Sequence, residues 1–427
     1  MMSYTCIICK LENVRVAKNS DNLAIGDCLG NPVIVSKDYP ENMIGVYFPC
    51  DGLLSQEFCK ANNLFPVLDK DGKRIGGGFF DSIKPRVRAQ KFRGNRSMGF
   101  FIGLDSLKFT AYDLDTLKIG DSFDSLDGVT VCSKYINPAT FKALNERKRG
   151  KKQPIAPLFF EHKDTDQFDY YSKEIPVGAI ITLSNKSHGT SGRYSYTTVN
   201  LTVPLWKRII NKVMLVFPTS KNEYVVGTRR TVLLSEDENK EGFHGSEAFR
   251  YNFLSNVRGK LPLNMTIYLE IRGWANNKPI MSPHSLDKND LKSLKNKYPS
   301  PMYFSYANLE GQCDYSVYRI TLSGNNGDQF DLSWDQVKAF CKKNDLKCAF
   351  ELTQSFVYDG NLEELKKKVY SYLDVPDPED GRHYSEGVVV RVDFNGVTSF
   401  YKKKGFYFSI GEGICKDSGS LDIEEAS

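Results

Sequence analysis

Alternating hydrophobic and polar positions predict a series of short strands in the first third of the chain. Runs of this kind, separated by turn-forming residues, occur at 5–11, 32–36, 43–48, 99–104 and 129–131. Many short strands with little helix between them are typical of a small barrel. We therefore expect residues 1–145 to form a strand-rich, barrel-like domain.

The pattern changes beyond a charged segment at 146–154, which we interpret as a basic linker. Further on, helical and strand periodicities are mixed. Apolar residues four apart predict a helix over 246–257, and the capping residues Ser333 and Asn361 predict the starts of two more. We therefore expect an α+β domain at 155–412, followed by an acidic, mobile tail at 413–427.

The composition changes this picture only slightly. With 41% hydrophobic residues and a net charge of +5, the chain has the composition of a globular protein with real cores. No apolar run reaches the length of a membrane span, and the first ten residues lack the features of a secretion signal. The ten cysteines show no disulfide framework. We therefore expect a cytoplasmic protein without a membrane segment, acting as a monomer.

Lys186 is the first candidate for chemistry. It closes an alternating apolar stretch and is followed three residues later by Gly189. A strand end fixes the direction of the lysine, and a glycine lets a phosphate approach the backbone, as a covalent nucleophile would require. An isolated lysine with this spacing is more often an ordinary surface residue. Whether Lys186 is a nucleophile or a surface lysine therefore depends on the motifs elsewhere in the chain.

Two glutamates and two lysines lie on other predicted strands. Glu270 alternates with apolar residues in 266–273, so it points away from the hydrophobic face, toward a metal or toward a partner such as Arg272. Glu386 opens the strand 386–392, and Lys402 and Lys404 lie on the returning strand, 397–408. Carboxylates suit a divalent metal, and lysines suit the phosphates of a nucleotide.

The turn between those last two strands contains Asn395-Gly396, a strong hairpin signal. A two-residue turn would make Glu386 face away from the lysines. A three-residue loop with a bulge pairs position 386 with 404, and 388 with 402, on one face. We therefore predict the bulged loop. Lysines gathered there with Lys186 would disfavour each other's protonation, so that one amine is partly neutral near pH 7.

Taken together, these segments resemble the motifs of covalent nucleotidyltransferases, and most of all RNA ligases with an N-terminal oligonucleotide-binding (OB) domain. The matching segments are Lys186-Ser187-His188-Gly189, Leu269-Glu270-Ile271-Arg272-Gly273, Tyr315-Ser316-Val317-Tyr318-Arg319, Glu386-Gly387 and Tyr401-Lys402-Lys403-Lys404. The resemblance implies an OB-like first domain and an antiparallel-sheet adenylation domain of the ATP-grasp-like ligase fold. Only 23 residues follow Lys404, fewer than the C-terminal OB domain of DNA ligases and capping enzymes needs.

The resemblance also implies roles for individual residues. Lys186 would take AMP from ATP, helped by Lys402 and Lys404. The further residues it assigns to nucleotide binding are His188, Gly189, Arg229 or Arg230, Glu270, Tyr315 and Glu386. Glu270 and Glu386 would organise Mg²⁺ or Mn²⁺ through water, and Tyr315 would stack on adenine unless it packs in the core. Asn185 and His188 replace acidic residues that many members have at these positions.

An RNA partner is implied by the same resemblance and by a row of basic residues in the first domain. The row comprises Arg86, Arg88, Lys91, Arg93 and Arg96. Together with nearby aromatic residues it suits binding to a nucleic-acid backbone, although a charged edge strand is the alternative.

The implied reaction seals a 5′-phosphate to a 3′-OH, at a nick in a duplex, through lysyl-AMP and an adenylylated 5′-phosphate. A capping-type guanylyltransferase and a non-catalytic nucleic-acid-binding protein are the alternatives. A virus or phage is a compatible source.

Overall fold

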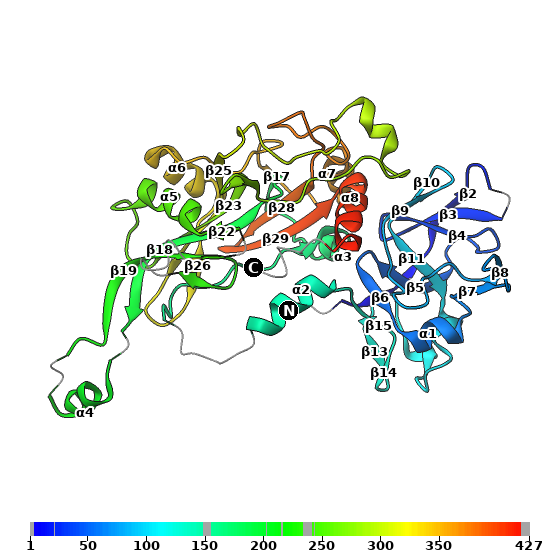
Figure 1. Cartoon of the computed structure of the whole chain (residues 1–427), viewed down its shortest axis with the longest axis horizontal. Coiled ribbons are helices and arrows are strands. Elements are labelled where there is room, and N and C mark those ends of the chain that lie inside the picture. The colour runs from blue at the N-terminus through cyan, green and yellow to red at the C-terminus, as the bar shows by residue number, and fades with distance from the viewer. Residues whose placement is uncertain are drawn as a thin grey trace. The chain divides into compact units, whose positions relative to one another are not determined.

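The computed structural model describes residues 4–20, 22–147, 155–201, 203–214, 217–233, 241–242 and 244–419. The chain divides into two compact units (Figure 1). Unit 1 comprises Met1–Asn137, Lys288–Ser293 and Ser409–Ser418, and unit 2 comprises Pro138–Asp287, Leu294–Phe408 and Gly419–Ser427. Of the predicted linker, 146–147 end a helix and 148–154 lie outside the described residues.

Unit 1 consists mainly of short antiparallel strands. They are β1 (Cys6–Lys10), β2 (Glu12–Val16), β3 (Leu23–Cys28), β4 (Asn31–Ser36), β5 (Ile44–Pro49), β6 (Gly52–Leu54), β7 (Pro66–Leu68), β8 (Arg74–Gly77), β9 (Gln90–Phe92), β10 (Asn95–Ser97), β11 (Gly99–Gly103), β12 (Ser122–Phe123), β13 (Ser125–Leu126), β14 (Val129–Thr130) and β15 (Cys132–Lys134), with helix α1 (Gln56–Ala61). The five strands predicted from alternation are present. The largest sheet has the order β11-β5-β1-β12. An OB topology for this unit stays a prediction.

Alternation explains how this sheet forms its core. Ile8 on β1 lies opposite Val46 on β5, and both side chains are fully buried. Phe48 and Phe58 pack in the same cluster, with ring centroids 5.1 Å apart. The inward positions of a pleated strand recur every second residue, so a short apolar alternation is enough to form this cluster.

Arg86 has a different role from the one predicted. Its side chain is buried, with Nη2 2.7 Å from Asp51 Oδ1 and Nη1 2.5 Å from Asp417 Oδ1. Lys416 Nζ lies 3.0 Å from the other oxygen of Asp51. Burial raises the pKa of Asp51, but Lys416 and Arg86 outweigh it and hold that pKa below its usual value. Arg86 is therefore a structural residue of unit 1 and is not exposed for RNA.

The rest of the predicted basic row lies on the surface or at its edge. Arg88 is exposed and lies 2.8 Å from Asp417 Oδ2. Lys91 and Arg96 lie opposite each other in the β9–β10 hairpin, and Arg93 is in its turn. Arg93 and Arg96 are exposed and Lys91 is half-buried.

We expect Arg86→Ala to destabilise unit 1 by about 2 kcal/mol, because it leaves two carboxylates without their buried charged donor. Urea unfolding followed by fluorescence measures this loss. Arg93→Ala, at an exposed site, is the control and should change stability by less than about 0.5 kcal/mol. Equal stability of both variants would contradict the structural role of Arg86.

Unit 2 contains two large sheets and most of the helices. Its strands are β16 (Asp166–Gln167), β17 (Ile180–Lys186), β18 (Thr190–Asn200), β19 (Ser220–Gly227), β20 (Val232–Leu233), β21 (Glu241–Gly242), β22 (Gly245–Ser246), β23 (Met265–Ala275), β24 (Lys278–Pro279), β25 (Cys313–Ser323), β26 (Gln329–Asp331), β27 (Phe356–Val357), β28 (Gly387–Phe394) and β29 (Val397–Lys404). Its helices are α2 (Pro138–Arg147), α3 (Phe168–Tyr171), α4 (Leu205–Met214), α5 (Ala248–Val257), α6 (Trp334–Asn344), α7 (Leu362–Tyr370) and the start of α8 (Phe406–Asp417), whose residues from 409 belong to unit 1.

Each large sheet buries one face and presents the other to the site. The first sheet has the order β16-β29-β28-β17-β27, and Leu183, Val388 and Val390 lie on its buried face. The second contains β20-β19-β18-β23-β25-β26, and its buried face carries Leu269 and Val317. Because the side-chain period of a strand is two, polar residues at the intervening positions point the opposite way.

The hairpin between β28 and β29 corrects the predicted register. Phe394 pairs with Val397, so Asn395 and Gly396 form a two-residue turn, and both have positive φ angles. Gly387 then pairs with Lys404. The bulged three-residue loop is wrong, because the plain turn already fits the twist of the strands.

The predicted helices are present, and one boundary differs. Ser333 forms a complete capping box with Gln336 at the start of α6, and the Asn361 side chain caps α7. The acidic tail predicted from 413 begins inside α8, which runs to Asp417, and 420–427 lie outside the described residues. Within the described residues, none of the helices combines the length and apolar character that crossing a bilayer requires.

Candidate active site

The polar faces of the two sheets of unit 2 line one pocket. From the first sheet, cross-strand rows place Ser184, Val389 and Lys402 side by side, and below them Thr182, Arg391 and Phe400. Lys186 ends β17 one row higher and also lines the pocket. The register of three strands therefore sets the spacing between Lys186 and Lys402.

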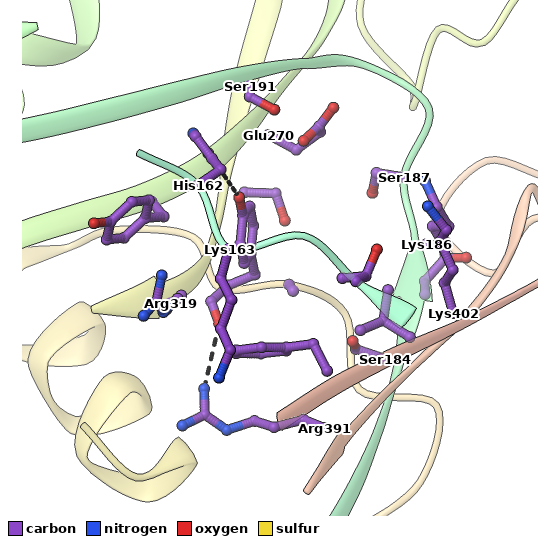
Figure 2. A pocket seen from close by; sticks show the side chains of 18 of the residues that line it. His162, Lys163, Ser184, Lys186, Ser187, Ser191, Glu270, Arg319, Arg391 and Lys402 are labelled. Carbon is purple, nitrogen blue, oxygen red and sulfur yellow. Dashed lines mark hydrogen bonds between the residues drawn. The ribbon is translucent and has the colours of Figure 1, made fainter. Parts of the chain in front are cut away.

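The second sheet contributes the opposite side of the pocket. Ser191, Glu270 and Ser316 form one row across β18, β23 and β25, and all three line the pocket. Tyr268 and Tyr318 lie further along the same sheet. Figure 2 shows Lys186 and Lys402 together at one side of the pocket, with Glu270 coming from the other sheet. The amine and this carboxylate, far apart in sequence, thus share one pocket.

A buried carboxylate holds the Lys186 amine. Glu386 Oε1 lies 2.7 Å from Lys186 Nζ and 3.5 Å from Lys404 Nζ, and the Glu386 side chain is completely buried. Burial raises the pKa of Glu386, but the charges of Lys186 and then Lys404 outweigh it, so this pKa lies below its usual value. The sequence predicts that repulsion among Lys186, Lys402 and Lys404 favours a neutral amine. The negative charge of Glu386, beside Lys186 and Lys404, offsets that repulsion.

Two glycines allow the close packing around these groups. A Cβ atom at Gly387 would lie 2.0 Å from the Lys403 carbonyl oxygen, and its φ of +156° also disfavours other residues. A regular two-residue hairpin would make Glu386 face away from Lys404. The irregular backbone at Gly387 accompanies the approach of the two side chains that the structure shows. A Cβ at Gly189 would lie 2.4 Å from the Ile271 carbonyl oxygen. Gly189 is therefore required by its close contact with β23, and the approach of a phosphate to it stays a prediction.

The residues on both sides of Lys186 are held by a buried network that the sequence did not reveal. Arg272, fully buried, donates from Nη1 to Ser187 Oγ at 3.0 Å and to Glu379 Oε2 at 2.7 Å. Asn185 Nδ2 donates to Asp377 Oδ2 at 2.8 Å. The Asp377–Asp380 turn thus fixes both neighbours of the nucleophile candidate. Arg272 also forms an ion pair with Asp314, in which Nη2 lies 2.6 Å from Oδ2.

His188 supports Glu386 from the side away from the pocket. Its Nδ1 lies 3.5 Å from Glu386 Oε2, and its backbone N–H donates to the Tyr306 hydroxyl at 2.5 Å. The ring packs edge-on against Phe304 and Phe408, with centroids 4.8 Å away in each case. His188 is buried and is not among the pocket-lining residues, so the structure places it behind the site.

The structure bears on two points that the sequence left open, Tyr315 and the pair Arg229–Arg230. The Tyr315 hydroxyl donates to the Phe249 carbonyl at 2.6 Å, and its ring packs on Phe253, on the buried face of the second sheet. Tyr318 lines the pocket instead, with its hydroxyl against His162 Nδ1. Of the two adjacent arginines, Arg229 lines the pocket and Arg230 does not.

The carboxylates available for a metal ion are fewer than expected. Among the described residues that line the pocket, Glu270 is the only carboxylate. Glu386 faces Lys186, Lys404 and His188, so the predicted metal role does not fit its surroundings. Over the described ranges, no group of three or more His, Cys, Asp or Glu residues is placed to hold a metal ion by itself. One carboxylate still fits a hydrated divalent ion that binds chiefly to substrate phosphates.

Comparison with known proteins identifies the family of this chain. The RNA ligase family model matches residues 180–404, which contain Lys186, Glu270, Glu386 and Lys404. The chain therefore belongs to the RNA ligase family. A search of curated proteins found no match.

The fold is similar to solved structures of Naegleria gruberi RNA ligase variants. One variant solved with ATP and Mn is 14% identical, with a TM-score of 0.56 over 96% of this chain and 98% of that one. A second, also with ATP and Mn, has 14% identity and a TM-score of 0.57 over 95% and 98%. A third, with AMP and Mn, has 14% identity and a TM-score of 0.57 over 95% and 97%. At this identity the likeness shows the fold.

The lowered pKa of Glu386 has a consequence for stability. An ionised carboxylate whose pKa is depressed in the folded state stabilises the fold above its unfolded pKa, about 4.3, and this contribution is lost as pH falls through the folded pKa. We therefore expect Glu386→Gln to be less stable than the parent at pH 7, with a difference that narrows below about pH 4. Denaturant unfolding across this pH range measures it. A difference that widened on acidification would contradict the assignment.

Proposed function

We propose that this RNA ligase uses ATP, and that Lys186 is the residue that becomes adenylylated. The observation that carries the proposal is the Lys186 amine, 13% exposed, at the pocket and 2.7 Å from a buried carboxylate. Lys402 and Arg229 line the same pocket and suit a triphosphate, and Glu270 suits a divalent ion bound to it. The similar Naegleria gruberi structures contain ATP or AMP with Mn, which supports ATP as the donor.

In the first step, Lys186 Nζ attacks the α-phosphorus of ATP. A P–N bond forms, the bond from the α-phosphorus to the bridging oxygen breaks, and pyrophosphate leaves with that electron pair. The ammonium must first lose a proton, and Glu386 Oε1 is the carboxylate oxygen beside it. Lys402 and Arg229 would offset the negative charge on the phosphates, which is the main requirement of phosphoryl-type transfer.

In the later steps AMP passes from Lys186 to an RNA 5′-phosphate, and a 3′-OH then displaces it. Each step breaks one bond at the adenylyl phosphorus or the activated phosphate and forms another, so no oxidant or reductant is needed. The proposed substrate is a nick in a duplex, with a 5′-phosphate and a 3′-OH at the break. Glu270 would hold Mg²⁺ or Mn²⁺ through water, and the ion would withdraw charge from the phosphates when bound.

The β9–β10 hairpin of unit 1 carries the residues that we propose contact RNA. Lys91 and Arg96 lie opposite each other on the β9–β10 hairpin, beside Arg93 in its turn. Phe92 is exposed, and Arg93 Cζ lies 5.6 Å from the centre of its ring. These groups suit a phosphate backbone with an unstacked base nearby. A monomeric state and a cytoplasmic location remain predictions.

Labelled ATP tests Lys186 directly. Incubation with [α-³²P]ATP and Mg²⁺ or Mn²⁺ should label the parent protein, and Lys186→Ala should remove the label because the nucleophile is gone. Lys163→Met is the matched control: this lysine also lines the pocket, but its amine donates to the Thr398 carbonyl at 2.7 Å. The control should keep the label. A labelled Lys186→Ala protein would refute the assignment.

The same assay separates the alternative functions. A capping-type guanylyltransferase would take label from GTP and not from ATP. A non-catalytic RNA-binding protein would take none from either nucleotide.

Tyr318, rather than Tyr315, is the residue that we propose to contact the base. Tyr318→Leu should raise the ATP concentration needed for half-maximal labelling by about tenfold, since stacking contributes about 1–3 kcal/mol. Tyr315→Phe removes only the hydrogen bond to Phe249 and should cost stability of about 1 kcal/mol without changing that concentration. If Tyr315→Phe altered the ATP requirement and Tyr318→Leu did not, the original assignment of Tyr315 would be restored.

A further inference from the structure

Helix α4 lies at the end of an arm that extends from β18 and β19 of unit 2 (Figure 1). We define the α4 arm as the described residues 201, 203–214 and 217–222, which follow β18 and include the first residues of β19. None of the residues that line the pocket belongs to this segment. The arm therefore has no place in the chemistry described above, although it is joined directly to the strand that carries Ser191.

The described side chains of α4 expose large apolar groups. Trp206 is 55% exposed, Ile209 58% and Ile210 37%. The Trp206 ring packs edge-on against Phe217, with centroids 5.6 Å apart. The Asn211 side chain donates from Nδ2 to the Phe217 carbonyl at 2.7 Å, and its Oδ1 accepts from the Phe217 N–H at 2.8 Å. An exposed cluster that is held in place in this way is typical of an interaction surface.

A positive charge lies within this aromatic cluster. Lys207 Nζ is 5.2 Å from the centre of the Trp206 ring and 4.9 Å from that of Phe217. A protein groove that covered the rings would also bury this ammonium, which is costly unless an anion accompanies it. A nucleic acid fits both features, because a base stacks on the indole while a phosphate meets the lysine.

The sequence of the arm has one sign of charge. It contains Lys207, Arg208, Lys212 and Lys221, and no aspartate or glutamate occurs anywhere from 175 to 222. Lys221 Nζ lies 2.7 Å from Glu223 Oε2, just beyond the arm, so residues 201–223 carry a net excess of three positive charges. Its complement is a polyanion.

We propose that the α4 arm binds the RNA substrate outside the active site, with a base or an exposed base pair on Trp206 and a phosphate at Lys207. This inference rests on the proposed RNA ligase function and adds a second contact region to it. β18 runs from Thr190, beside the pocket, to Asn200, a length of about 33 Å at about 3.3 Å per residue. The arm should therefore reach only RNA that extends about 30 Å or more from the sealed site.

Nicked RNA duplexes with short and long flanks test this reach. In the full-length protein, Trp206→Ala combined with Lys207→Glu should weaken binding of a duplex with flanks of about 20 base pairs by about tenfold. Binding of a duplex with flanks of about 6 base pairs should not change. Fluorescence anisotropy gives both dissociation constants, and the slope of log Kd against log salt should fall by about one to two for the long duplex.

Phe330→Ala is the matched control, because Phe330 is an aromatic residue of the same unit, 59% exposed, outside the arm. Lys207→Glu alone gives a second variant that leaves the aromatic pair intact. Unchanged binding of the long duplex by both arm variants would overturn the proposal. So would arm-dependent binding to anionic phosphatidylserine vesicles without arm-dependent binding to RNA, which would assign the helix to a membrane surface.

Labelling by ATP distinguishes this inference from the proposed function. The arm variants should form lysyl-AMP at the parental rate, because the arm does not line the pocket. If the parent itself took no label while the arm variants lost long-duplex binding, the nucleotide chemistry would fail and the arm would stand. If label formed normally and long-duplex binding was unaffected, the arm would fail and the chemistry would stand.

Discussion

The site depends on one buried carboxylate that is shared by two lysines. An isolated carboxylate without solvent costs several kcal/mol, so Glu386 is tolerable in its position only because Lys186 and Lys404 lie beside it. Those lysines come from strands on either side of β28. Their separation is set by the pairing of Lys186 with Gly387 and of Gly387 with Lys404. The positions of the charges are therefore a property of the sheet.

The sheet in turn is held by its apolar face. Leu183, Val388 and Val390 are fully buried under the strands that carry the charges. A shift of register by one residue would exchange the two faces and expose these side chains, which makes such a shift unfavourable. The three consecutive lysines 402–404 alternate between the two faces of the sheet. Lys403 is buried and pairs with Asp169, whereas Lys402 and Lys404 lie on the opposite face.

Features of the site that depend on local sequence patterns could be predicted, and features that depend on contacts between distant residues could not. Alternation along single strands was sufficient to place Lys186, Glu270 and Lys402 on polar faces. The register of the hairpin was not, because Asn395-Gly396 is compatible with more than one loop. Tyr315 had a usable signal: it shares parity with Val317, so it belongs to the apolar face. That parity favours the core-packing alternative over stacking on adenine.

Other parts of the site had no local signal. Arg272 meets Glu379, 107 residues away, and Asn185 meets Asp377, 192 residues away. Nothing in either segment identifies its partner, because a buried charge can be satisfied by any opposite group that the fold delivers. Arg86 illustrates the same limit. Its basic neighbours suggested a nucleic-acid surface, whereas its position is determined by two aspartates distant in sequence.

The pairing of Arg86 with Asp417 also bears on how the protein is made. The two residues are 331 positions apart, yet both belong to unit 1, together with Lys416 and Asp51. At about 5–20 residues per second, a ribosome needs roughly 20–60 s to proceed from one to the other. During that interval the nascent N-terminal strands carry a guanidinium without its distal anion. Maturation of this unit is thus completed only near the end of translation, and a fragment ending at 145 would lack the segment that neutralises its interior.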